Sequence, residues 1–182
     1  CPELENCVGD TSIALSQIAD DNQFFEVKAE YAKDMVTGFI RLNGATVGCV
    51  ANRSEIYNEE GEKTDSFDNV LSARGCKKAA EFVKFCDAFE IPVLTLTNVK
   101  GYKATKCSEA NMARNAAELT SAFTSATVPK VNVVIGQAFG SAYLTMNSKS
   151  TGAVMVFAWP SAQIGMMDAK LAAKIMYADA DI

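Results

Sequence analysis

The 182-residue sequence contains no histidine. Within these residues, a Ser-His-Asp triad, a Cys-His pair and an imidazole metal ligand are therefore excluded. The six cysteines include no Cys-x-x-Cys pair, so we expect no metal site. Cys49 and Cys86 lie in apolar segments and are expected to be buried. Any catalysis must then use carboxylates, lysine, tyrosine, cysteine or backbone dipoles.

Positive charge is also scarce, because 17 Lys and Arg residues face 22 Asp and Glu residues and the net charge is −5. This balance argues against nucleic acid or an anionic membrane as a partner, since phosphate contacts need an excess of cations. No apolar run reaches the ~20 residues of a membrane span. The first residues, Cys-Pro-Glu-Leu-Glu, do not resemble a signal peptide. We expect a cytoplasmic protein whose given sequence begins inside a longer chain.

What is present is typical of one globular domain, with 49% apolar and 21% charged residues. A hairpin followed by repeated strand–helix units predicts an α/β fold with parallel strands. Residues 1–10 are expected to be a linker, and residues 52–70 a surface loop. The predicted helices are 11–19, 75–89, 108–126, 141–146 and 169–177; the predicted strands are 36–42, 47–51, 93–97, 131–135, 153–158 and 162–165, with an extended piece at 24–27.

Two segments are candidate ligand sites, because α/β folds bind ligands at the carboxyl ends of strands and at helix N-termini. The first is residues 98–105, where Lys100-Gly101-Tyr102 is expected to turn the chain. The second is residues 136–142, a predicted loop that leads into a helix. Taken alone, the second segment also fits an ordinary loop-to-helix turn with a serine near the cap.

Several stretches resemble, in order, the second domain of acyl-CoA carboxylase β subunits. The resemblance covers nearly the whole chain beyond about residue 10, and the ordered set is more specific than any single motif. It implies a crotonase-like α/β fold, a single-domain β-β-α superhelix, with residues 11–182 forming a carboxyltransferase C-terminal domain cut short at its end. The matching stretches are Phe-Phe-Glu-Val at 24–27, Val-Thr-Gly-Phe-Ile-Arg-Leu-Asn-Gly at 36–44, Ala-Ala-Glu-Phe at 79–82, Ala-Thr-Val-Pro-Lys at 126–130, Ala-Phe-Gly-Ser-Ala-Tyr at 138–143 and Ala-Trp-Pro-Ser-Ala-Gln-Ile at 158–164.

The resemblance also implies an activity of the acetyl- or propionyl-CoA carboxylase type. A carboxyl group would move between carboxybiotin, held on a separate carrier domain or protein, and an acyl-CoA. The expected partners are an N-terminal carboxyltransferase domain or subunit and the biotin carboxyl carrier protein, in a homo- or hetero-oligomer. Alone, the domain would be inactive, because its partner would supply much of the acyl-CoA pocket.

The family pattern places the catalytic groups at one turn. The backbone N–H groups of Ser141 and Ala142 would stabilise negative charge on the ureido oxygen of biotin, and Gly140 would keep the approach open. Leu144 and Arg114 also fit a core leucine and a solvated helix residue. The residues that would bind substrate are Gly101, Tyr102, Tyr143, Leu144 and Arg114.

The sequence departs from the family pattern at several of these places. The family has Gly where Ser141 stands, Phe where Tyr102 stands and Gly where Asp168 stands. The loop from Lys100 to Thr105 lacks the family's Pro-Gly pairs. Two alternatives therefore remain open: the same fold in a biotin-dependent acyl-CoA decarboxylase, and a non-catalytic scaffold that completes an oligomer.

Overall fold

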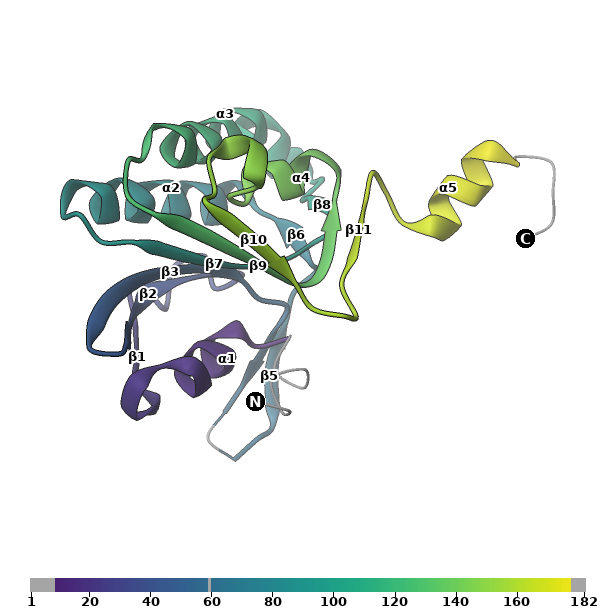
Figure 1. Ribbon diagram of the computed structural model, residues 1–182. Helices are drawn as coiled ribbons and strands as arrows, with labels where there is room; N and C mark the ends of the chain where they lie inside the picture. Colours follow the sequence, from purple (N-terminus) through teal and green to yellow (C-terminus); the bar gives the residue numbers. More distant parts are fainter. Residues whose placement is uncertain (1–8, 59, 178–182) are drawn as a thin grey trace.

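The central feature of the computed structural model, which describes residues 9–58 and 60–177, is a seven-stranded sheet (Figure 1). The sheet runs in the order β1-β2-β3-β7-β9-β10, and β11 pairs with the far end of β9. β1 to β3 are antiparallel, whereas β3, β7, β9, β10 and β11 are parallel. The predicted class is therefore confirmed. The strands are β1 (Phe24–Glu26), β2 (Met35–Leu42), β3 (Ala45–Asn52), β7 (Val93–Val99), β9 (Lys130–Phe139), β10 (Met155–Ala158) and β11 (Gln163–Gly165).

The predicted hairpin joins β2 to β3 through Asn43 and Gly44. Both residues have positive φ, 51° and 78°, as a two-residue turn that follows the sheet twist requires. The carboxylate of Asp20, in the short helix η2 (Asp20–Asn22), accepts hydrogen bonds from both backbone N–H groups, at 3.1 Å and 2.8 Å. The turn is thus held from outside as well as by its own sequence.

Helices cover both faces of the sheet. In Figure 1, α2 (Ala73–Ala88) and α3 (Lys106–Ser125) lie on one face, and α1 (Thr11–Ile18) lies on the other. Each face has its own core: Cys86 belongs to the cluster under α2 and α3, and Cys49 to the cluster under α1. Both cysteines are fully buried, as predicted.

The two long helices, α2 and α3, begin two residues earlier than predicted, because the residues that cap them lie earlier in the sequence. Ser72 accepts a hydrogen bond from the Gly75 N–H at 3.0 Å, so α2 begins at residue 73. Thr105 and Ser108 form a capping box, so Ser108 is the third residue of α3 and not its start.

Pairing partners change three predicted loops into strands. The segment 52–70 contains the hairpin β4 (Glu55–Tyr57) and β5 (Lys63–Ser66), and ends in β6 (Val70–Leu71). β6 pairs in parallel with β8 (Gly101–Tyr102), where the sequence predicts a turn. The predicted loop 136–140 is mostly the end of β9, since β11 gives it a partner as far as Phe139.

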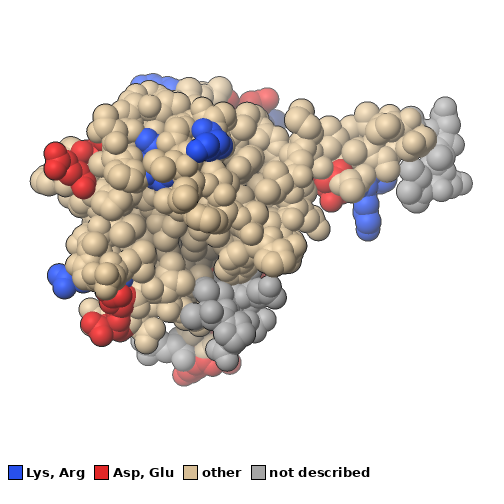
Figure 2. All heavy atoms as spheres, in the orientation of Figure 1, with Lys and Arg blue, Asp and Glu red and all other residues tan. Residues whose placement is uncertain are grey.

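The last described residues, from β11 onward, form an extension. After α4 (Gly140–Thr145), η3 (Lys149–Thr151) and β10, the chain passes through β11 into α5 (Ala169–Met176). α5 stands away from the body in Figures 1 and 2, and none of its residues is buried. Residues 1–8 of the predicted linker lie outside the described part of the chain, while Asp10 is the buried N-cap of α1. Among the described helices, none combines the length and the hydropathy needed to cross a bilayer.

Candidate functional site

The two predicted segments meet at one cavity of about 330 Å³. β8 contributes Gly101 and Tyr102, and the start of α4 contributes Gly140, Ser141 and Ala142. Five of the eight predicted site residues are therefore brought together, although nearly 40 residues separate the two segments. The other lining residues are Lys100, Phe139, Met166, Met167, Asp168 and Leu171.

The turn into α4 carries backbone donors in residues that line this cavity. Gly140 has a φ of 57°, and a Cβ there would approach the Met166 carbonyl oxygen to 3.2 Å, so glycine is favoured. The N–H groups of Ser141 and Ala142 lie in the first turn of α4, where the helix offers no partner. Among the described residues, neither group donates a hydrogen bond. Two neighbouring N–H donors are thus available at the cavity.

Strand ends below the cavity are tied by asparagine side chains. Asn98 Oδ1 accepts the Gln137 N–H at 2.8 Å, and Asn52 Oδ1 accepts the Asn98 N–H at 2.9 Å. Asn52 Nδ2 also donates to the Asn98 carbonyl. Gly136 is needed beside them, because a Cβ would come within 2.5 Å of Asn98 Oδ1. These contacts satisfy buried backbone groups where the β7–β9 register shifts.

The C-terminal end of α4 is anchored by further buried polar contacts. Asn132 Nδ2 donates to the Met146 carbonyl at 3.1 Å, and Asn147 Nδ2 donates to Thr95 Oγ1 at 2.7 Å. Both asparagines are fully buried. The short helix is therefore pinned to β7 and β9 just after its last residue, which fixes the position of its first turn.

Three predicted substrate-binding residues lie outside the cavity. Tyr143 packs against the core cluster under α2 and α3, and burial raises the pKa of its phenol. Leu144 is 47% exposed, which also excludes the alternative of a core leucine. Arg114 is exposed on α3 and lines a separate groove beside Arg74 and Lys77. The lining of the cavity therefore does not include these three residues, although Tyr143 and Leu144 follow Ala142 directly in α4.

Asp168 lines the cavity, although the sequence pattern marks it only as a departure from the family. Its carboxylate accepts the backbone N–H groups of Lys170 at 3.0 Å and Leu171 at 3.4 Å, so it is the N-cap of α5. An aspartate just before an apolar helical run is a recognisable cap signal. The methionines and the leucine beside it carry no comparable signal in the sequence.

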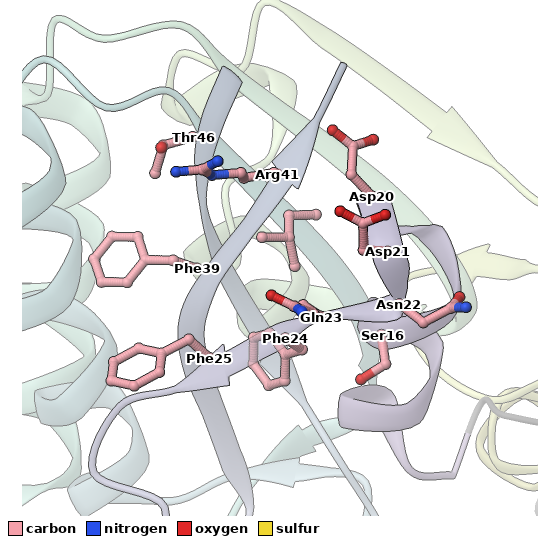
Figure 3. A pocket seen from close by; sticks show the side chains of 11 residues that line it. Ser16, Asp20, Asp21, Asn22, Gln23, Phe24, Phe25, Phe39, Arg41 and Thr46 are labelled. Carbon is pink, nitrogen blue, oxygen red and sulfur yellow. The ribbon is translucent and has the colours of Figure 1, made fainter. Parts of the chain in front are cut away.

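A second and larger cavity, about 680 Å³, lies elsewhere, between η2, β1 and β2. Figure 3 shows the rings of Phe25 and Phe39 on one side of it and the carboxylates of Asp20 and Asp21 on the other. Asp20 is already used to hold the β2–β3 turn. Within the described residues, no cluster of three or more Cys, Asp or Glu side chains could hold a metal ion.

Comparison with solved structures shows the class of fold. The structure is similar to transcarboxylase 12S, with a TM-score of 0.83 and 39% identity over 93% of this chain and 32% of that chain. It is also similar to the geranyl-CoA carboxylase beta subunit of P. aeruginosa, with a TM-score of 0.80 and 25% identity over 93% of this chain and 30% of that chain. The fold is crotonase-like, as the resemblance implied.

Sequence comparison then defines the family. The family described as "Carboxyl transferase domain" matches residues 1–182. The propionyl-CoA carboxylase beta chain of Roseobacter denitrificans is 39% identical over 177 residues, 97% of this chain and 33% of that protein. The methylmalonyl-CoA carboxyltransferase 12S subunit of Propionibacterium freudenreichii subsp. shermanii is 38% identical over 169 residues, 92% of this chain and 30% of that protein. The chain belongs to the carboxyl transferase domain family and spans about a third of the length of these relatives.

Proposed function

We propose that this chain is one half of a biotin-dependent acyl-CoA carboxyltransferase. In this proposal the N–H groups of Ser141 and Ala142 stabilise the negative charge that develops during transfer. The supporting observation is that these two unpaired donors belong to residues that line one cavity with Gly101 and Tyr102, in a chain of the carboxyl transferase family. Biotin on a separate carrier would supply the carboxyl group and take up the α-proton of the acyl-CoA, so no protein base is required.

The residues of the cavity suit this task. Paired backbone donors are preorganised, so they stabilise an oxyanion without moving when the charge appears. Gly140 has no side chain to block their approach. Met166 and Leu171 form an apolar wall, and once a second domain covers it the lower local dielectric would strengthen such hydrogen bonds. The carboxylate of Asp168 is engaged in capping α5.

A second domain or subunit completes the site in this proposal. Met166 and Leu171 belong to the extension and are 83% and 52% exposed, so this wall of the cavity is open. Among the named relatives, transcarboxylase 12S is described as a hexamer assembly and a multienzyme core. We infer that an N-terminal carboxyltransferase domain or subunit covers the extension, that a biotin carrier protein docks beside it in the cytoplasm, and that this chain alone is inactive.

A pair of substitutions at Ser141 tests the role of the turn. In the full-length protein, assembled with its biotin carrier, Ser141→Pro removes one N–H donor, whereas Ser141→Ala keeps it. We expect Ser141→Pro to lower the rate of carboxyl transfer to propionyl-CoA, the substrate named in several relatives, by about 10²–10³-fold relative to Ser141→Ala. Equal rates in two variants with equal thermal stability would refute the proposed role.

The same assembled protein separates the alternatives. Net carboxylation of an acyl-CoA by the carboxylated carrier supports the proposal. Turnover only from a carboxylated acyl-CoA toward biotin identifies a decarboxylase, which uses the same donors in the opposite direction. Intact assembly without turnover in either direction identifies a scaffold.

A further inference from the structure

A chain of three hydroxyl groups meets the backbone of the turn. The Tyr102 hydroxyl lies 3.1 Å from the Ser141 carbonyl oxygen, to which it can donate, and 2.7 Å from Thr145 Oγ1. Thr145 Oγ1 lies 3.2 Å from the same carbonyl oxygen, and Thr120 Oγ1 is 3.3 Å from Thr145 Oγ1. The three side chains come from β8, α4 and α3. Their contacts meet at Thr145 Oγ1 and so join three separate elements.

The carbonyl of Ser141 shares a peptide unit with the N–H of Ala142. Because that unit is planar and trans, the C=O and the N–H point in opposite directions and cannot rotate independently. A hydrogen bond that holds the Ser141 oxygen on one side therefore fixes the direction of the Ala142 N–H on the other side. The bond from Tyr102 thus acts on one of the two donors through the peptide plane.

Helix geometry alone does not account for the bond from Tyr102. A threonine that donates to the carbonyl four residues earlier, as Thr145 does to Ser141, is ordinary within a helix. Tyr102 lies 39 residues away in another element. Its only described hydroxyl partners are the Ser141 oxygen and Thr145 Oγ1, which is buried. The sequence predicted that Tyr102 binds substrate, but the structure engages its hydroxyl with the turn.

The acceptor of the Tyr102 hydroxyl is a backbone atom. It is the carbonyl oxygen of residue 141, at 3.1 Å, which any residue at that position would carry. The bond therefore depends on the hydroxyl at position 102 and not on the side chain of Ser141. The family resemblance gives Phe at position 102, and a phenylalanine could not make this bond.

We propose that Tyr102 is a positioning residue that orients the Ser141–Ala142 peptide, with Thr145 as its buried support, so that the Ala142 N–H faces the cavity. This inference rests on the proposed function of the turn. Tyr102 acts through the peptide and does not itself contact the reacting atoms. The position of Tyr102, in the segment before α3, therefore affects the orientation of the peptide at the start of α4.

The test uses the assembled full-length protein and the same carboxyl-transfer assay. Tyr102→Phe removes only the hydroxyl and keeps the ring, so the packing of the side chain is retained. We expect kcat to fall about 3- to 10-fold, the loss that corresponds to one hydrogen bond, with KM for the acyl-CoA unchanged. Tyr57→Phe is the control, because it removes a hydroxyl that donates to Glu55 at 2.6 Å far from the turn. The control should leave kcat unchanged.

A double-mutant cycle distinguishes positioning from general loss of packing. Thr145→Val removes the second hydroxyl of the chain, and Thr145→Ser retains it. We expect Tyr102→Phe and Thr145→Val together to cost less than the product of the single effects, because both act on the Ser141 oxygen. Thr145→Ser should restore the kcat that Thr145→Val loses.

The outcomes separate this inference from the proposed function. Loss of activity in Ser141→Pro with an unchanged kcat in Tyr102→Phe overturns the positioning role and leaves the function of the turn intact. A rise in KM with constant kcat in Tyr102→Phe also overturns it, because a substrate contact would then be lost. If Ser141→Pro and Ser141→Ala are equally active, the proposed function fails and the positioning role fails with it.

Discussion

Residues 35–135 and residues 154–177 use the same kinds of apolar side chain, but the first region buries most of them and the second leaves most of them exposed. Val50 and Leu119 are 0% exposed, whereas Met155, Phe157 and Ile175 are 52–63% exposed. Leu171 and Ile175 are four residues apart on α5 and so share one face of that helix. Exposed apolar faces of this kind are typical of interaction sites. The first region has a packed core, and the exposed apolar face of α5 is the basis for the proposal that another polypeptide covers it.

The strongest test of this comparison is to replace one leucine of each region by alanine and to compare the losses of unfolding free energy. Leu119→Ala should lower the free energy of unfolding by about 2–5 kcal/mol, because it leaves a cavity in a packed core. Leu171→Ala should change it by no more than about 0.5 kcal/mol, because the side chain is already half exposed. Urea unfolding of the two variants measures both values. Similar losses would show that the extension is part of the same core.

Lys78 tests how tightly the first region is packed. Its side chain is 1% exposed and Nζ donates to the Met35 carbonyl at 2.7 Å. Burial lowers the pKa of Lys78 from its ordinary value of 10.5 to about 8. The unfolded chain therefore binds more protons between these two pH values, and the stability of the folded chain rises with pH through that window.

We expect the pH dependence attributable to Lys78 to be at most roughly 3 kcal/mol, at 1.36 kcal/mol per pKa unit. It is measured as the difference in unfolding free energy between the parent and Lys78→Met at pH 7 and at pH 10. The unfolding free energy of the parent should rise relative to that of Lys78→Met as the pH rises. Lys77→Met, at the exposed neighbouring position, is the control and should show no such gain.

Charge on the extension should affect assembly and leave the fold unchanged. Ile175→Asp places a carboxylate on the exposed apolar face of α5 and should weaken association with the proposed partner domain or subunit by about 1.5–3 kcal/mol, the value of one buried aliphatic side chain. Sedimentation of the full-length complex measures the change. Lys174→Glu is the matched control on the same helix. If both variants assemble as the parent does, the extension is not the covered surface.

The smallest expected effect is at the cap of α5. Asp168→Ala should cost about 1 kcal/mol of helix stability, because two backbone N–H groups lose their acceptor. Hydrogen exchange should become faster in α5 and remain unchanged in α2. Asp168→Asn, which can also cap, should restore most of the protection; faster exchange in both helices would contradict a local role.

Periodicity and turn chemistry predict much of this fold. Asn43-Gly44 marks the hairpin, and the spacing of Phe82, Val83 and Cys86 marks the buried face of α2, because both signals are local. The strands β6, β8 and the end of β9 are missed, because each depends on a partner distant in sequence. Local patterns carry no information on such pairing.

The location of the candidate site is predictable, but its internal contacts are not. Gly101 and Gly140 line one cavity because parallel strands end at the same edge of the sheet. The hydroxyl of Tyr102 contacts Ser141, and no spacing in the sequence indicates that bond. Leu144 and Arg114 are placed by family position alone, and the structure leaves them outside the cavity: Leu144 is 47% exposed, and Arg114 lines a separate groove.

The central claim is that backbone donors of the turn stabilise the transferred charge. Its most direct test is the ratio of kcat between Ser141→Ala and Ser141→Pro in the assembled full-length enzyme, because the two variants share the loss of the hydroxyl and differ in the backbone N–H. We predict a ratio of about 10²–10³ with equal thermal stability. A ratio near one would contradict the account.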